Sequence, residues 1–458
     1  MYDLVIIGYG PGGYSASLLA LRKGLNIAIV EESKLGGNCL NRACIPTKYY
    51  WTGAKFIEKL DVLSNYGIFI DKNKIDFKQA FEKKNEAIKY LRKSLRQLLK
   101  SKKVNVYKGK GKIIDKNKIL VVDKDGNQSI VEAKNIIIAT GSKPNSVGNL
   151  KLDNKYIMST DFLLEKLDNL PKSVLIVGGG VAGCELGYIL NKYGVNVYIV
   201  ELKDRLLPSR DVSKDISRHL LRKFKKLGIK TFFNTTIEDY KIENGFIDVK
   251  LSNGENLKVG KIVLSVGRVP NSDNIDEIGI EKDNKGFIKV NQFLQTNYSN
   301  IYAIGDVIKS PMLAYTSSME GEIAVKNILG EKIQPSYEYI PYAIFSAYEI
   351  AYIGLNEETA KEKGINITYG MYSYSFNEKA VDESDTDGFI KLFFDKSDKR
   401  FLGGYIMGSF ASELMHLLEI ALRESYTAEQ LHNLIYFHPS ITEIIPFASY
   451  DVAEGKLF

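Results

Sequence analysis

The chain has 458 residues, which is enough for about two to four domains, each with its own hydrophobic core. With 45% hydrophobic and 26% charged residues, the composition excludes a disordered or fibrous protein. A formal net charge of +7 is small for this length, so charge alone gives no reason to expect a nucleic-acid partner.

The N-terminus enters an apolar strand without a basic leader or cleavage site, and no run of about 18 apolar residues follows. We therefore expect a cytoplasmic protein without a membrane span. The three cysteines are too few for a disulfide-rich secreted scaffold.

An internal repeat with an offset of 170 residues begins at the first strand. The matching positions are Gly8, Gly10, Gly13 and Glu31 in the first copy, and Gly178, Gly180, Gly183 and Glu201 in the second. Each copy reads as a strand, a G-x-G-x-x-G turn, a helix, a second strand and an acidic residue. In a dinucleotide site the three glycines allow the tight turn, the approach of the pyrophosphate and close helix packing, and the carboxylate binds ribose. One such turn is weak evidence, but two aligned copies predict two dinucleotide-binding units.

Cys39 and Cys44 follow the first unit in the run GGNCLNRACIPTK, with four residues between them. In a reducing compartment, a disulfide that closes so short a loop favours a catalytic role over a structural one. Zinc binding and two inert thiols are the alternatives, but no third or fourth ligand lies nearby in the sequence, so we predict no metal. Cys184 is interpreted as a small residue that packs on the sheet of the second unit.

The most basic part of the chain extends from Lys83 to Lys103. The apolar residues within it recur at helical spacing, and they are Ile88, Leu91, Leu95, Leu98 and Leu99. We predict an amphipathic helix whose lysines and arginines line the opposite, solvated face.

A similar strand and turn closes each dinucleotide unit, at residues 136–141 and 262–267, and a proline follows each at Pro144 and Pro270. Residues 301–307 supply a further strand with a Gly-Asp turn, in which Asp306 is either a cofactor contact or a structural turn residue. The predicted boundaries place the first unit at residues 1–143 and 272–341, with the second, at 144–271, inserted into it. Strands at 389–394 and 401–407 and helices at 411–423 and 428–435 then indicate a third, α+β domain at 342–458.

The run from Gly36 to Lys48 resembles the redox-active segment of the class I pyridine nucleotide-disulfide oxidoreductases. The resemblance extends along essentially the whole chain, through ATGSKP at 139–144, GRVPN at 267–271, AIGDV at 303–307, PMLA at 311–314 and HPSITE at 438–443. It implies an α/β protein with two Rossmann-like domains, which bind FAD and NAD, and a C-terminal α+β dimerisation domain. Within the family the sequence is most similar to the dihydrolipoamide dehydrogenases.

The resemblance also implies roles for six residues. Cys44 is the thiolate next to the flavin, and Cys39 is the thiol that exchanges with the substrate. His438, oriented by Glu443, is the base and comes from the other subunit of a homodimer. Lys48 and Glu185 pair beside the flavin, with ordinary surface charges as the alternative interpretation.

The remaining expected contacts belong to the two cofactors. The FAD set is Gly8, Gly10, Gly13, Glu31, Gly37, Lys48, Gly111, Thr140, Gly141, Asp306, Met312, Leu313 and Ala314. The NAD set is Gly178, Gly180, Gly183, Glu185, Glu201 and Gly267. Glu201 favours NAD, because the 2′-phosphate of NADP would meet a like charge there, although Lys203 and Arg205 are close in sequence.

The expected reaction transfers two electrons between a dithiol and NAD through FAD and the Cys39–Cys44 disulfide. Reduction of another small disulfide by NAD(P)H, a transhydrogenase or diaphorase activity, and a catalytically silent flavoprotein are the alternatives. Aromatic residues near both halves of the expected site favour an apolar lipoyl group, free or on a carrier protein, over a charged peptide. These residues are Tyr49, Tyr50, Trp51, Tyr436 and Phe437.

Overall fold

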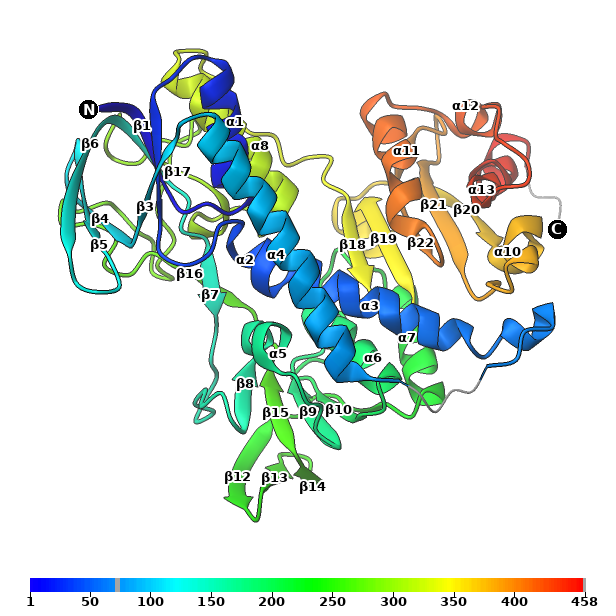
Figure 1. Ribbon diagram of the computed structural model, residues 1–458. Coiled ribbons are helices and arrows are strands. Elements are labelled where there is room, and N and C mark those ends of the chain that lie inside the picture. The colour runs from blue at the N-terminus through cyan, green and yellow to red at the C-terminus, as the bar shows by residue number, and fades with distance from the viewer. Residues whose placement is uncertain (71–74, 456–458) are drawn as a thin grey trace.

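The computed structural model describes residues 1–70 and 75–455, which form three α/β units. In Figure 1 the first unit lies at the upper left, the second at the bottom and the third at the upper right. Two helices, α3 (Cys44–Lys59) and α4 (Phe77–Ser101), cross the region between the units. The observed fold is the predicted one, with two Rossmann-like units and a C-terminal α+β unit.

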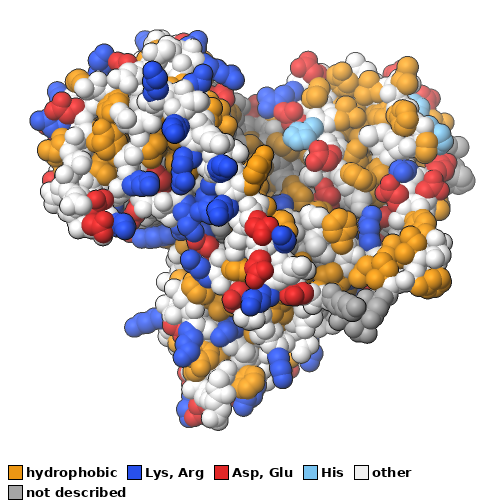
Figure 2. Space-filling model, in the orientation of Figure 1, with side chains coloured by type: hydrophobic (Ala, Val, Ile, Leu, Met, Phe, Trp, Pro, Cys, Tyr) orange, Lys and Arg blue, Asp and Glu red, His pale blue; other side chains and the backbone are white. Residues whose placement is uncertain are grey.

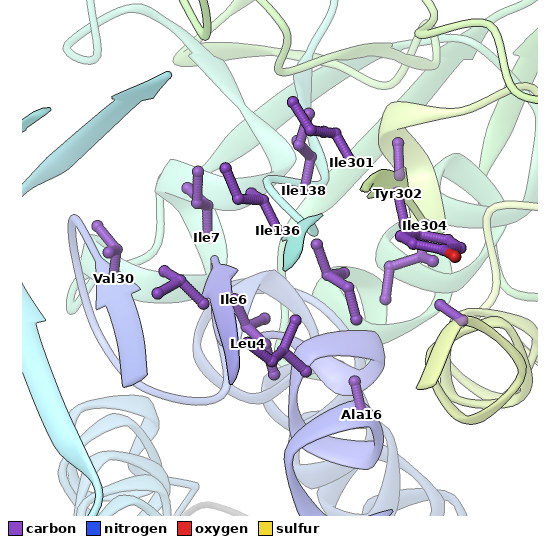
Figure 3. Close-up of a cluster of buried hydrophobic side chains, with 14 of the residues drawn as sticks. Leu4, Ile6, Ile7, Ala16, Val30, Ile136, Ile138, Ile301, Tyr302 and Ile304 are labelled. Atoms are coloured by element: carbon purple, nitrogen blue, oxygen red, sulfur yellow. The ribbon is translucent and has the colours of Figure 1, made fainter. Parts of the chain in front are cut away.

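A parallel sheet forms the core of the first unit. Its strands, in spatial order, are β3 (Asn105–Lys108), β2 (Ile27–Glu31), β1 (Tyr2–Ile7), β6 (Gln128–Ile138) and β17 (Ile301–Ala303). β4 (Lys110–Asp115) and β5 (Lys118–Val122) extend it in antiparallel fashion from the first half of β6. The helices α1 (Pro11–Arg22) and α8 (Ala314–Ile328) pack together beside it. The parallel strands are buried, so their sequences are nearly continuous runs of Val and Ile. Figure 3 shows the buried side chains of these strands.

The second unit repeats this plan. Its parallel sheet has the order β11 (Lys230–Phe232), β10 (Asn196–Val200), β9 (Ser173–Val177), β15 (Lys261–Leu264) and β8 (Ile157–Ser159). Leu4 pairs with Ile27 in the first unit and Val174 with Val197 in the second, so the pairing registers also differ by the offset of the sequence repeat. The helices of this unit are α5 (Thr160–Lys166), α6 (Val181–Lys192) and α7 (Lys214–Lys226), and its antiparallel strands are β12 (Ile237–Glu243), β13 (Phe246–Leu251) and β14 (Asn256–Val259).

The chain passes between these two units along β7 (Ser142–Pro144) and β16 (Arg268–Pro270). The two strands pair in antiparallel fashion, so both crossings run side by side. Of the boundaries that we propose from the sequence, 143/144 lies within β7 and 271/272 lies just after β16.

The third unit is an antiparallel sheet with helices on it. Its strand order is β18 (Tyr342–Phe345), β19 (Glu349–Gly354), β22 (Phe401–Met407), β21 (Phe389–Asp395) and β20 (Ile367–Ser373). Its helices are α9 (Glu357–Glu362), α10 (Glu378–Asp382), α11 (Ala411–Arg423), α12 (Ala428–His432) and α13 (Ile444–Ala453). The predicted helix at 411–423 is confirmed. The one at 428–435 ends early at His432, where Asn433 is the C-cap, a position that asparagine favours.

The helix α4 confirms the predicted helix in the basic region but corrects the assignment of its faces. Lys84 is fully buried, where its ammonium group donates to the carbonyl oxygen of Leu164 on α5 at 2.7 Å and lies 4.3 Å from the centre of the Phe81 ring. Leu91, expected in the apolar stripe, is 39% exposed. Among the described residues, no helix combines the length and apolar character needed to cross a membrane.

We predict that Lys84→Met weakens the pH dependence of stability. Desolvation lowers the pKa of Lys84 to about 8, against 10.5 for the ordinary side chain. Between these values the unfolded chain binds more protons than the folded one, so the free energy of unfolding rises with pH. Urea unfolding at about pH 7.5 and about pH 9.5 should show this rise in the native protein and a smaller one in the variant. An equal rise in both would contradict the prediction.

Candidate active site

A cavity of about 700 Å³ opens at the carboxyl ends of β1, β6 and β17, where open α/β sheets bind their ligands. Both cysteines of the GGNCLNRACIPTK run line it. So do ten residues of the expected FAD set, namely Gly8, Gly10, Glu31, Gly37, Gly111, Thr140, Gly141, Asp306, Met312 and Ala314. The other three members of that set, Gly13, Lys48 and Leu313, do not line the cavity.

The glycine turn of the first unit is held by packing at two of its three positions. Gly8 has a φ of +98°, and a Cβ there would lie 2.3 Å from the carbonyl oxygen of Ala139. A Cβ on Gly13 would lie 2.2 Å from the carbonyl oxygen of Gly8, which explains why this residue lies behind the cavity wall. A Cβ on Gly10 would have only Gly37, at 3.9 Å, as a neighbour, so this position leaves room for a ligand.

The second turn has the same construction. Cβ atoms on Gly178 and Gly183 would lie 2.3 Å from the carbonyl oxygen of Ser265 and 2.0 Å from that of Gly178, whereas nothing lies within 4 Å of one on Gly180. Gly10 and Gly180 are the N-cap residues of α1 and α6, and neither has a side chain that caps the helix. The first N–H groups of both helices are therefore available to phosphate groups.

The two repeat glutamates bind their own turns. Glu31 accepts hydrogen bonds from the backbone N–H groups of Tyr9 and Ser33, both at 2.8 Å. Glu201 accepts them from Gly179 at 2.7 Å and Lys203 at 2.8 Å. Burial raises the pKa of Glu31. Each carboxylate thus holds a glycine turn in place at the end of its second strand.

The groups that line the cavity suit a phosphate-bearing dinucleotide such as FAD. The hydroxyl oxygen of Thr140 is buried at the wall without a hydrogen-bond partner in the protein. Four basic side chains that the sequence analysis did not select also line the cavity, and they are Lys34, Arg42, Lys110 and Arg268. Arg42 belongs to the GGNCLNRACIPTK run and Arg268 to GRVPN, whereas Lys34 and Lys110 lie outside the motifs quoted above.

The two cysteines are bonded to each other as a disulfide. Cys39 lies on α2 (Gly37–Arg42), and Cys44 is the first residue of α3, with Ala43 between the helices. A helix N-terminus stabilises negative charge, so a thiolate released by reduction is favoured at Cys44. Among the described residues, no group of three or more His, Cys, Asp or Glu side chains is arranged to hold a metal ion.

Lys48 lies one turn after Cys44 on α3, and its ammonium group is 3.2 Å from a carboxylate oxygen of Glu185 on α6. The same oxygen accepts a hydrogen bond from the backbone N–H of Phe345 on β18, at 3.0 Å. The Lys48 ammonium also lies 4.4 Å from the centre of the Phe345 ring. The pair therefore joins elements of all three units, one helical turn after Cys44.

A second polar network, which the sequence analysis missed, centres on Asp161 of α5. Arg268 donates to both of its carboxylate oxygens, at 2.7 and 3.2 Å, and to the hydroxyl of Ser142 at 2.7 Å. Ser142 in turn donates to Asp306 at 2.5 Å. The side-chain amide of Asn38, next to Cys39, donates to Asp161 at 3.0 Å and accepts from Arg268 at 3.2 Å. The network joins the segment between Asn38 and Cys44, named here the redox loop, to the cavity wall and to both chain crossings.

His438 and Glu443 contact each other but not the disulfide of their own chain. His438 Nδ1 is 3.0 Å from a carboxylate oxygen of Glu443, and the histidine side chain is 65% exposed. The hydrogen bond and charge of Glu443 raise the pKa of His438. Figure 1 shows the α12–α13 region far from α2, so a single chain does not bring the expected base to the cysteines.

The aromatic residues invoked for substrate binding lie in different surroundings within one chain, and their role in substrate binding stays a prediction. Tyr50 is buried and stacks on Phe77, and Trp51 donates to the carbonyl oxygen of Ser346 at 2.8 Å. Tyr436 packs against the core of the third unit, whereas Phe437 is 78% exposed. Cys184 is buried as interpreted, which raises the pKa of its thiol.

Two family models match the chain. One, described as pyridine nucleotide-disulphide oxidoreductase, covers residues 2–321. The other, described as the dimerisation domain of pyridine nucleotide-disulphide oxidoreductases, covers residues 340–448.

Relatives and solved structures match over nearly the full length. A dihydrolipoyl dehydrogenase of Bacillus subtilis is 35% identical, covering 99% of this chain and 97% of its own. The mitochondrial dihydrolipoyl dehydrogenase of Bos taurus is 33% identical, covering 99% and 91%. The crystal structure of LpdA from Mycobacterium tuberculosis superposes with a TM-score of 0.90 at 25% identity, covering 98% and 99%. The flavoprotein disulfide reductase RclA from Escherichia coli, at 24% identity and a TM-score of 0.89 over 98% and 99%, shares the fold.

We predict that Glu443→Gln lowers the pKa of His438 toward its ordinary value of 6.5, because the substitution removes the charge that stabilises the protonated ring. An NMR titration of the His438 ring in the native and variant proteins measures the change. If catalysis needs the neutral imidazole, activity should also persist to lower pH in the variant, so the acid limb of the pH-rate profile should shift to lower pH. An unchanged or higher pKa would contradict the role assigned to Glu443.

Proposed function

The chain belongs to the pyridine nucleotide-disulphide oxidoreductase family, and from this we propose that it is a dihydrolipoyl dehydrogenase, which oxidises a dihydrolipoyl dithiol with NAD⁺. It is a flavoprotein disulfide oxidoreductase with a redox-active Cys39–Cys44 pair, and the family binds FAD and a pyridine nucleotide. The dithiol, the choice of NAD and the roles of individual residues are the parts that we propose.

The observation that carries the proposal is the Cys39–Cys44 disulfide in the wall of the dinucleotide cavity. A substrate thiolate attacks Cys39, so that the bond between the two cysteines breaks and Cys44 leaves as a thiolate at the start of α3. The second substrate thiolate then displaces Cys39, which completes the substrate disulfide. The net reaction breaks two S–H bonds, forms one S–S bond and reduces NAD⁺ to NADH with release of one proton.

Bound FAD would supply the two-electron transfer between the cysteines and the nicotinamide. The glycine turn, Thr140 and Asp306 would hold it in the cavity. Lys48, fixed by Glu185 and one helical turn after Cys44, would stabilise negative charge near the disulfide. His438 of the partner subunit would take the thiol proton, and Glu443 keeps the imidazole oriented.

NAD is preferred over NADP because of the charge at the end of β10. Glu201 lies there, where a 2′-phosphate would meet its carboxylate. Arg205, which could have neutralised that phosphate, instead donates to the carbonyl oxygens of Val212 at 3.0 Å and Ser209 at 2.8 Å. Lys203 remains the nearby basic side chain that is exposed.

The lipoyl group is supported by the names of the relatives that match nearly the whole chain, which are dihydrolipoyl dehydrogenases at 31% to 35% identity. Another small disulfide is the alternative, because Tyr50 is buried and Tyr49 and Trp51 pack partly against the same core.

We predict that the protein reduces NAD⁺ with free dihydrolipoamide as the electron donor. The kcat/KM for NAD⁺ should be at least about tenfold above that for NADP⁺, which corresponds to about 1.4 kcal/mol of discrimination. The same preparation should reduce glutathione disulfide poorly with NADH or NADPH. Cys44→Ser should abolish dithiol turnover while flavin remains bound. Efficient turnover of another disulfide with negligible lipoamide activity would overturn the substrate, and dithiol turnover by Cys44→Ser would overturn the mechanism.

We predict a homodimer in which each active site takes His438 from the partner subunit. Cys44→Ser and His438→Ala should each be inactive alone. In the mixed dimer, one of the two sites has both native cysteines and a native histidine. Equal mixing with proven subunit exchange should therefore restore about a quarter of native activity, given statistical pairing and independent sites. Absence of recovery would place the base within a single chain.

A further inference from the structure

One segment of the chain has basic residues without any acidic ones. Between Glu86 and Asp115 the sequence has ten lysines and arginines and no aspartate or glutamate. On α4 these residues include Lys89, Lys93, Arg96 and Lys100, which are spaced to share one side of the helix, and all four are exposed. We name these four residues the α4 basic face. Figure 2 shows Lys and Arg side chains gathered over this part of α4.

The protein itself leaves these charges uncompensated. Within the described residues, the side chains of the α4 basic face make no hydrogen bond or ion pair, and the ion pair on this helix is Lys83 with Glu86, at its other end. Like charges spaced three or four residues apart destabilise a helix by roughly 0.2–0.5 kcal/mol per pair. The arrangement therefore carries a folding cost, which an external acidic partner would offset.

Two features relate this face to the redox site. The first turn of α4 packs on α3, the helix that begins at Cys44, through the stacking of Phe77 on Tyr50 with ring centres 5.2 Å apart. Lys84 then fixes α4 to α5, the helix whose Asp161 contacts the redox loop. A partner on α4 would thus sit on an element rigidly connected to the disulfide.

An exposed aromatic residue lies among the charges. Tyr90, which follows Lys89 on α4, is 71% exposed. Aromatic residues and arginine are enriched in protein interfaces, because they add apolar contact area to the charged rim. This mixture favours an acidic protein over a nucleic acid, which would be held mainly through its phosphates.

We propose that the α4 basic face docks an acidic protein domain that carries the dithiol substrate to the active site. This inference rests on the proposed function, since it assigns the protein domain to which the dithiol substrate is attached. Complementary charge raises the association rate of such a carrier by about 10- to 1,000-fold at low salt, and the effect is screened as salt increases. A free, uncharged dithiol gains nothing from this face.

The test compares one dithiol in two forms, free dihydrolipoamide and a dihydrolipoyl group on a purified acidic carrier domain. The variant Lys89→Glu, Lys93→Glu, Arg96→Glu reverses three charges of the face. It should lower kcat/KM for the carrier by about tenfold or more at low salt, with little effect on kcat, flavin content or turnover of the free dithiol. The deficit should shrink as ionic strength increases.

A matched control reverses three exposed basic residues on α7, as Arg222→Glu, Lys225→Glu, Lys226→Glu, and should behave as the native protein with both substrates. Equal loss in test and control variants, or loss of free and carrier turnover together, would overturn the docking site. So would binding of duplex DNA or anionic vesicles, but not of the carrier, through the α4 face. Failure of the native protein to oxidise free dihydrolipoamide would instead overturn the proposed function, and the docking proposal with it.

Discussion

The ion pair between Asp161 and Arg268 is the contact on which the geometry of the site depends. Both side chains are largely buried, at 10% and 21% exposure, and the pair reaches Asn38 in the redox loop and Ser142 at the chain crossing. A buried pair adds little net stability compared with apolar packing, but removal of one partner leaves a charge unpaired, which is strongly destabilising. The pair therefore fixes how the units fit together more than whether they fold. Glu165, one turn further along α5, pairs with Lys34 and Arg42 of the cavity wall and supports the same arrangement.

The two copies of the dinucleotide unit show how one fold carries two tasks. Their strands, turns and carboxylates match in register and in hydrogen bonding. They diverge after the acidic residue, where the first copy continues into α2 and the cysteines and the second into α7. The redox pair is thus an addition at the carboxyl end of one sheet, where α/β folds position their ligands. Glu185 and Lys48 join the copies across this addition.

Charge along the chain is far less even than the net value of +7 suggests. Acidic and basic residues nearly balance in total, yet the stretch between Glu86 and Asp115 has only basic ones. Electrostatic fields in water act over about 8–10 Å at physiological salt, so a partner responds to such a local cluster and not to the total. Net charge therefore gave no reason to expect a partner surface, whereas the distribution of charge does.

The sequence alone determined the features that depend on neighbouring residues. The repeat, both glycine turns, the paired cysteines and the boundaries of α11 follow from local spacing, because backbone sterics and helical periodicity act over a few residues. The tertiary structure decided which side of α4 holds Lys84, where Tyr50 and Trp51 face, and that Asp161 meets Arg268 and Asn38. The contacts of Lys84 and of Asp161 with Arg268 join segments 80 or more residues apart, and burial of a side chain is set by the elements that pack on it. A local sequence pattern cannot predict these contacts, because they form only when the distant sheets and helices come together.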